Sequence, residues 1–247
     1  MRRKFNNEST ILRDAMPRLI AALVRHGEYH QRAHIPSALQ PYPLNARGFV
    51  QAGEAAAALI AEAAQNQWDI CNRIDSSTLL RAWQTAERYR LAIQGHFNKP
   101  AHLASFNALC ERSVGSAANL TLAEIQKIIS DDPRFADLPE DWKSNSHFCL
   151  PLAGAESLMM AGQRVAEHIS MSMQDCINAE CDTLKVFVGH GAAFRHAAHI
   201  LDVLNFDDIA KFSMHHAKPI YIELIDDKWV HIGGDWKLRD GARTMLD

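Results

Sequence analysis

Residues Leu19 to Gly27 read LIAALVRHG, an apolar run that stops abruptly at arginine, histidine and glycine. A short apolar run with such an ending is typical of a strand that is buried on both faces. A second run of this kind, Leu184 to Gly191, reads LKVFVGHG. Because the carboxyl ends of parallel strands meet at one edge of a sheet, ligands bind there. The two runs therefore predict that His26 and His190 lie on the same rim.

Segments with helical character separate these two runs. Alanine- and glutamate-rich stretches predict helices over residues 47–65, 79–93, 156–174 and 192–204, the first capped by Asn45. Shorter strands are expected over residues 69–75 and 102–106, and residues 219–225 and 228–232 predict a hairpin around Asp226-Asp227. This alternation predicts an α/β fold, a three-layer α/β/α sandwich with a mostly parallel sheet.

The 247 residues are expected to form one domain, 1–247, with an insertion or lid at about residues 119–152. Within it, DDPRFADLPEDWKSNSHF (131–148) combines prolines, acids and aromatics without regular periodicity. Arg134, Trp142, Lys143 and His147 are candidate substrate contacts. Phe135 and Trp142 fit equally well as a small core belonging to the insertion itself.

Composition and charge exclude several classes of partner. The net charge is -3, so no overall basic field attracts nucleic acid or an anionic membrane, and we expect neither as a partner. Five cysteines without a CxxC pair argue against a disulfide framework and favour a reducing, cytoplasmic location. The N-terminus lacks the pattern of a secretory signal. No metal ligand set or cofactor is expected, and the sequence does not define the oligomeric state.

The two predicted rim histidines suit phosphoryl transfer. A covalent site of this kind needs a nucleophile, cations or N–H donors around the phosphate oxygens, and an acid for the leaving group. Neutral imidazole is a good nucleophile, and a guanidinium group nearby, such as that of Arg25, would keep it neutral. We also expect a helix N-terminus to follow each His-Gly pair and to add backbone donors.

Several segments, in order, resemble the motifs of the histidine phosphatase superfamily, which includes the cofactor-dependent phosphoglycerate mutases. They are Val24–Glu28 (VRHGE), Pro43–Ala52 (PLNARGFVQA), Ser76–Ala86 (SSTLLRAWQTA), Leu109–Gly115 (LCERSVG), Gly154–Val165 (GAES…RV) and Val188–Gly191 (VGHG). A lone RHG tripeptide recurs by chance, whereas this ordered set is hard to produce by chance. The resemblance covers most of the chain and implies a phosphoglycerate mutase-like fold.

The resemblance also implies roles for individual residues. His26 is implied as the nucleophile that becomes phosphorylated. Arg25, Arg81 and His190 are implied to surround and bind the phosphoryl oxygens. Glu111 is implied to protonate the leaving oxygen and then to take a proton from the attacking water or alcohol.

Further polar residues are weaker candidates. Arg32 is a possible replacement contact to the substrate, and Gln31 beside it is a second substrate-binding candidate. For His30, His34 and the pair His215-His216, a surface position is a better expectation than a place in the pocket.

Departures from the mutase pattern bear on the reaction. The mutases' "S-x-W-N" stretch is replaced by YHQR (29–32), their tyrosine and lysine positions hold Val114 and Leu122, and no Arg-Arg pair follows Glu111. A small trianionic substrate needs those cations. We therefore expect a metal-independent phosphatase that hydrolyses a phosphate monoester through a phosphohistidine. A mutase-like phosphotransferase and a non-catalytic phosphate- or phosphoprotein-binding module remain as alternatives, and the substrate can be a small-molecule ester or a phosphoprotein.

Overall fold

A seven-stranded sheet forms the centre of the molecule. The computed structural model describes residues 17–96 and 100–239. The strands of the sheet are β1 (Leu19–Arg25), β2 (Asp69–Ile70), β3 (Arg73–Ser77), β4 (His102–Phe106), β5 (Thr183–Gly189), β7 (Pro219–Ile225) and β8 (Lys228–Gly233). They lie in the order β4-β3-β5-β1-β7-β8, with β2 beside β5. The strands β1 to β5 run parallel, β7 pairs antiparallel with β1, and β8 pairs antiparallel with β7, which confirms the predicted mostly parallel sheet.

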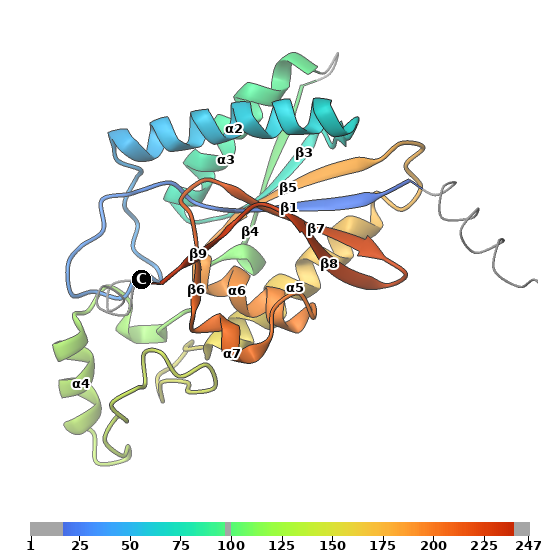
Figure 1. Ribbon diagram of the computed structural model, residues 1–247. Helices are drawn as coiled ribbons and strands as arrows, with labels where there is room; N and C mark the ends of the chain where they lie inside the picture. The colour runs from blue at the N-terminus through green and yellow to red at the C-terminus, as the bar shows by residue number, and fades with distance from the viewer. Residues whose placement is uncertain (1–16, 97–99, 240–247) are drawn as a thin grey trace, which may run out of the picture.

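Helices cover both faces of this sheet (Figure 1). On one face lie α2 (Ala46–Asn66) and α3 (Leu80–Ile93), and on the other lie α5 (Leu158–Gln174) and α6 (Gly191–Ile200). Successive residues of β1 point to opposite faces and enter two separate apolar cores, which explains why this strand is apolar throughout. The predicted α/β/α sandwich is confirmed. In the described part of the chain, no helix has the length and apolar character needed to cross a membrane.

The ends of several elements differ from the sequence prediction. The predicted strand over 69–75 is wrong: β2 ends at Ile70 and β3 begins at Arg73, because β2 pairs with the start of β5 and β3 with its end. The last predicted helix ends at Ile200 and not at 204, since the chain turns at Asp202 with a positive φ of 59°. The hairpin is confirmed: Asp226 and Asp227 both have positive φ, as a two-residue turn between twisted strands requires.

Three short elements near the rim were not predicted. They are α7 (Phe206–Ile209) and the two strands β6 (Phe212–Met214) and β9 (Trp236–Leu238), which pair with one another. Segments of three or four residues show no recognisable periodicity. Their formation depends on contacts with the rest of the molecule.

The segment predicted as an insertion contributes to a small separate core that it shares with neighbouring loops. Its helix α4 (Leu122–Ser130) begins with a capping box in which Thr121 and Glu124 bond each other's backbone amides. Trp142 is 3% exposed and packs in a cluster that includes Ala38 and Val114, so the expectation of a core role is confirmed for this tryptophan. Phe135 lies outside that cluster, beneath the Arg134 guanidinium. The insertion therefore packs against the loops near residues 38 and 114, which border the rim.

A buried carboxylate joins α5 to the sheet. Asp75 is fully buried on β3 and accepts hydrogen bonds from His168 Nε2 (3.0 Å), Ser172 Oγ (2.6 Å) and Arg73 Nε (2.8 Å). The Lys185 ammonium lies 3.9 Å away. Burial alone would raise the pKa of Asp75, but the hydrogen bonds from His168, Arg73 and Ser172 outweigh it and lower the pKa to about 2.

We expect Asp75→Asn to lower the free energy of unfolding by about 3 kcal/mol at pH 7, because it leaves the buried Lys185 ammonium without a carboxylate and weakens the hydrogen bonds that Asp75 accepts. The folded-state pKa is about 2 and the ordinary value is 3.8, so this contribution is present above about pH 4 and is lost as the pH falls toward 2. Urea unfolding at several pH values between 7 and 3 measures both effects. The free energies of unfolding of wild type and variant should converge as the pH falls. The exposed Asp137→Asn is the control, with a change within about 0.5 kcal/mol, and equal stability of wild type and Asp75→Asn at pH 7 would contradict the prediction.

Candidate active site

The two histidines of the His-Gly pairs meet at the carboxyl ends of adjacent strands. His26 follows β1 and His190 follows β5, and these strands run side by side with Arg25 opposite Gly189. The two imidazole rings lie 5.1 Å apart between centroids. Both side chains are buried, with His26 3% exposed and His190 fully enclosed. The prediction that they share one rim is confirmed.

Hydrogen bonds define the protonation of both rings. His26 Nδ1 lies 2.8 Å from the Gly27 carbonyl oxygen, which only accepts, so Nδ1 carries the proton and Nε2 the lone pair. Arg81 Nε donates to that Nε2 (3.2 Å), and its Nη2 donates to His190 Nδ1 (3.2 Å). The His190 Nε2–H then donates to Ser77 Oγ (2.9 Å). Burial first, and the Arg81 guanidinium next, hold the pKa of both histidines well below the ordinary value, so both are neutral.

The Arg81 side chain is held in place from several sides. It is fully buried at the start of α3, and it donates to the carbonyl oxygens of Gln40 (2.9 Å) and Ser37 (2.8 Å). Its guanidinium carbon lies 4.6 Å from the ring centroid of Tyr29, and this ring also meets His26 edge-on at 5.2 Å. Sequence reasoning missed Tyr29. Its only signal was its position three residues after the first histidine.

A narrow hollow of about 20 Å³ opens beside His26. It brings together Arg25, His26, Gln31 and Glu111, four of the residues predicted from the sequence. Arg25 Nη1 donates to the Met214 carbonyl oxygen on β6 (3.2 Å). The other residues that line the hollow are Tyr29, Ser37, Gly191, Ala192, Arg195 and Ser213. Arg81 and His190 are buried next to His26 and are absent from this lining, as is the exposed Arg32.

The loop that carries Glu111 is tied to α5. The Arg164 guanidinium donates to the carbonyl oxygens of Ala108 (2.9 Å), Cys110 (2.7 Å) and Glu111 (3.0 Å). The same guanidinium pairs with both carboxylate oxygens of Glu156, at 2.8 and 2.9 Å. The sequence motif contained Arg164 and Glu156, but nothing in it showed that they hold the loop of the predicted acid.

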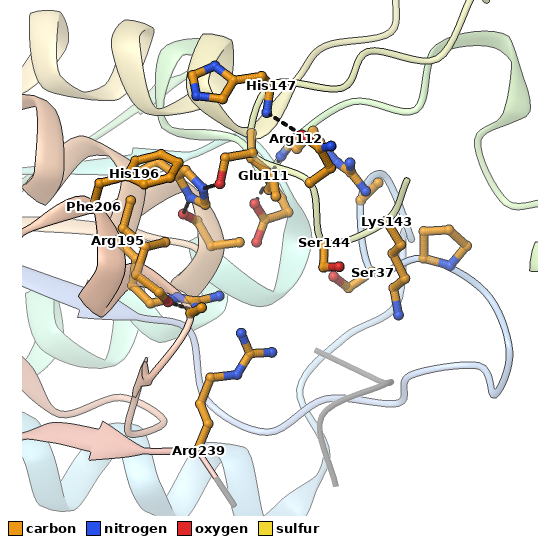
Figure 2. Close-up of a pocket in the computed structure, with 18 of the residues that line it drawn as sticks. Ser37, Glu111, Arg112, Lys143, Ser144, His147, Arg195, His196, Phe206 and Arg239 are labelled. Carbon is orange, nitrogen blue, oxygen red and sulfur yellow. Dashed lines mark hydrogen bonds between the residues drawn. The ribbon is translucent and has the colours of Figure 1, made fainter. Parts of the chain in front are cut away.

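A larger pocket of about 500 Å³ adjoins the hollow (Figure 2). The two share Ser37, Glu111, Ala192 and Arg195. From the insertion, Lys143 and His147 line the larger pocket, as expected of candidate contacts. Arg134 and Trp142 are absent from the lining among the described residues. Glu111 thus borders both spaces.

Only one of the two His-Gly pairs leads directly into a helix. After β5 the chain enters α6 at Gly191, as predicted. After Gly27 it runs as a loop until α2 begins at Ala46, so the prediction of a helix there is wrong. The Gly27 amide donates to Thr85 Oγ1 on α3 (3.0 Å). This backbone amide is therefore bonded to a side chain and does not form part of a helix N-terminus.

His216 is a second correction. Its Nδ1–H donates to the His26 carbonyl oxygen (3.0 Å), and its ring lies 5.9 Å from that of His26. The expectation of a surface position is wrong for this residue, because the Ala217 amide bonds the Arg25 carbonyl (2.8 Å) and brings the segment onto the end of β1. Across residues 17–96 and 100–239, no group of three or more His, Cys, Asp or Glu side chains is placed to hold a metal ion.

The comparisons agree with this geometry. A family model described as the histidine phosphatase superfamily (branch 1) matches residues 21–233. The chain belongs to this superfamily. No protein of curated function matches the sequence.

Solved structures similar to this superfamily member include both a mutase and phosphatases. A phosphoglycerate mutase from Bacillus anthracis is 16% identical, with a TM-score of 0.65 over 90% of this chain and 95% of that one. A putative alpha-ribazole-5'-P phosphatase from Escherichia coli is 17% identical, with a TM-score of 0.62 over 90% and 97%. A mycobacterial glucosyl-3-phosphoglycerate phosphatase is 22% identical, with a TM-score of 0.57 over 90% and 97%. At these identities the likeness is one of fold.

Proposed function

We propose that this protein is a metal-independent phosphomonoesterase that works through a phosphohistidine on His26. One observation carries the proposal: the Gly27 carbonyl holds the Nδ1 proton, which leaves Nε2 as a neutral nucleophile directly beside the Arg81 guanidinium. Any phosphoryl group bonded to Nε2 would contact this cation. The guanidinium groups of Arg81 and Arg25 would supply the positive charge that phosphoryl transfer needs.

The proposed reaction has two steps. In the first, His26 Nε2 bonds to phosphorus while the bond from phosphorus to the alcohol oxygen breaks and Glu111 donates a proton to that oxygen. The ring gains positive charge, which the Gly27 carbonyl stabilises through Nδ1–H. In the second, the Glu111 carboxylate takes a proton from water, whose oxygen bonds to phosphorus as the N–P bond breaks. Inorganic phosphate leaves, and both residues return to their starting protonation.

Two features support hydrolysis over mutase chemistry. The residue at the mutases' tyrosine position, Val114, is fully buried in the small core around Trp142 and so is not available to a substrate. The residue at the lysine position, Leu122, lies at the start of α4 and packs against the same core. The pocket of about 500 Å³ beside the hollow has the size of a small-ligand site, which supports a small-molecule ester over a phosphoprotein.

The test is an assay of phosphate release from 4-nitrophenyl phosphate and from alkyl phosphates in the presence of EDTA. Rapid acid and base quenches of the reaction should reveal a phosphoenzyme that is labile in acid and stable in base, the behaviour of phosphohistidine. A requirement for a divalent cation, or an acid-stable phosphoenzyme, would overturn the mechanism. Transfer of the phosphoryl group to a substrate hydroxyl in preference to water would identify a mutase, and binding without turnover of any ester would identify a binding module.

Glu111→Gln gives a separate test of the proposed acid. Because an amide donates no proton to the leaving oxygen, we expect kcat for an alkyl phosphate to fall by about 10²-fold to 10⁴-fold. 4-Nitrophenolate leaves without protonation, so kcat for 4-nitrophenyl phosphate should fall much less. Steady-state kinetics with the two esters measure the difference. Equal losses with both would show that Glu111 has another role.

A further inference from the structure

Two of the five cysteines lie against each other in the apolar core beneath α5 and α6. Cys71 directly follows β2, and Cys176 lies just beyond the end of α5. Cys176 is 8% exposed within that core, and the partly exposed Cys71 packs against it. The two side chains are hydrogen-bonded to one another, and both are free thiols. Two sulfur atoms that are far apart in the chain are therefore direct neighbours in the fold.

Polar contacts hold the two cysteine-bearing segments together. The Arg73 guanidinium, two residues after Cys71, donates to Ser172 Oγ on α5 (2.9 Å). It also pairs with Asp175, the residue before Cys176, at 3.3 Å. A disulfide forms only where the two backbones are close and suitably oriented. These contacts fix the segments on both sides of the thiol pair, so the sulfur atoms can bond without a large movement of the backbone.

The surroundings of Cys71 favour its thiolate, which is the form that reacts with oxidants. The hydrogen bond from Cys176 first, and then the backbone amide of Arg73 and the charges of Lys185 and Arg73, outweigh burial and lower the pKa of the Cys71 thiol to about 6. The same hydrogen bond, together with burial, raises the pKa of Cys176. The more exposed thiol of the pair is therefore also the one that ionises.

We propose that Cys71 and Cys176 are an oxidative modification site and form a reversible disulfide when the protein meets hydrogen peroxide. In the first step the Cys71 thiolate sulfur bonds to one peroxide oxygen, the O–O bond breaks, and the released hydroxide takes up a proton to give water. In the second, the Cys176 sulfur bonds to the Cys71 sulfur as the S–O bond of the sulfenic acid breaks. The Cys176 proton leaves with this hydroxide as water. The two thiols lose two electrons, which reduce the peroxide, and a dithiol reverses the reaction by exchange.

This site is independent of the proposed phosphatase function. The Cys71 amide donates to the Leu184 carbonyl oxygen (2.8 Å) near the start of β5, whereas His190 follows the end of that strand. The disulfide would close a long loop between β2 and the end of α5, and such a constraint lowers the entropy of the unfolded chain. We therefore expect oxidation to raise the urea midpoint of unfolding by about 1 M, and reduction with dithiothreitol to restore the original value.

The experiment exposes the full chain to a small excess of hydrogen peroxide at neutral pH, blocks the remaining thiols with N-ethylmaleimide and maps the peptides without reduction. Mass spectrometry should find one peptide joined to another through Cys71 and Cys176, and dithiothreitol should separate them. The exposed Cys149 and Cys181 report on oxidation that follows accessibility alone. Under the same conditions both should remain free to react with the maleimide.

Variants separate the thiol pair from the other cysteines. Cys71→Ser and Cys176→Ala should each abolish the joined peptides and the rise in the urea midpoint, and the Cys71 sulfenic acid should accumulate in Cys176→Ala, where dimedone traps it. The double variant Cys149→Ser/Cys181→Ser is the matched control and should behave as wild type. The proposal is overturned if Cys71 and Cys176 keep their thiols while Cys149 and Cys181 are oxidised. It is also overturned if wild-type Cys71 reaches the sulfinic acid without joining Cys176, or if the disulfide links two protein molecules.

Discussion

His26→Ala should reduce kcat for phosphate ester hydrolysis by about 10⁵-fold to 10⁶-fold, the loss expected when a covalent nucleophile is removed. The reason lies in the geometry of the ring. Its Nδ1 proton is held by the Gly27 carbonyl, and its Nε2 lone pair is the basic nitrogen that faces Arg81. Alanine leaves no atom to which phosphorus can bond. The phosphoenzyme should therefore vanish together with turnover.

Steady-state phosphate release and acid–base quench of the phosphoenzyme measure this effect. Because the ring is buried, circular dichroism should confirm that the variant folds. His102→Ala removes an exposed histidine at the start of β4 and serves as the control, with activity close to wild type. Residual turnover above about 1% of wild type would show that another group attacks phosphorus.

Arg81→Ala should lower kcat/KM by about 10³-fold to 10⁵-fold, the range found when an arginine that stabilises a transferred phosphoryl group is absent. Its Nε lies 3.2 Å from His26 Nε2, so this guanidinium lies directly beside the site of bond formation in the proposed mechanism. Arg81 also donates to the carbonyls of Ser37 and Gln40, and its loss would loosen that loop. Arg81→Lys keeps the charge and loses the forked donors, so an intermediate loss is expected.

The pH dependence gives a second readout for Arg81. Burial first, and Arg81 next, lower the pKa of His26, and the neutral ring is the nucleophile. Activity is therefore lost as the pH falls through this pKa. Without Arg81 the pKa of His26 rises, so the acid limb of the kcat/KM profile should move to higher pH. Arg90→Ala, on the same helix and paired with Glu87, should change neither quantity, and an unshifted acid limb in Arg81→Ala would contradict the proposed coupling.

Local patterns were sufficient to predict the main elements of the fold. The runs that end at Arg25 and at Gly189 are apolar because both faces of β1 and β5 are covered by helices, and that periodicity is visible in the sequence alone. The side chain of Asn45 accepts from the Gly48 amide, as its capping position predicted. The Asp226-Asp227 turn could also be predicted from the sequence, because aspartate is one of the few residues that tolerate positive φ at both positions of such a turn.

The same local reasoning fails where an element is very short, or where pairing with a neighbouring strand determines the residues at which it begins and ends. β2 and β3 are separate because each pairs with a different part of β5. The elements α7, β6 and β9 are too short to form without tertiary support, since short segments gain most of their stability from packing. Their positions nonetheless matter for the site, because Arg25 donates to a carbonyl of β6.

The sequence by itself determined the order of buried strands and covering helices, the family, and the set of polar residues that follow the two central strands. Those properties depend on the spacing of apolar residues and on short motifs, which act along the chain. Only the tertiary structure decided that Arg81 hydrogen-bonds both imidazoles and that His216 joins the rim. Each of these depends on contacts between residues far apart in the chain, and the burial and charge that set their chemistry exist only after folding.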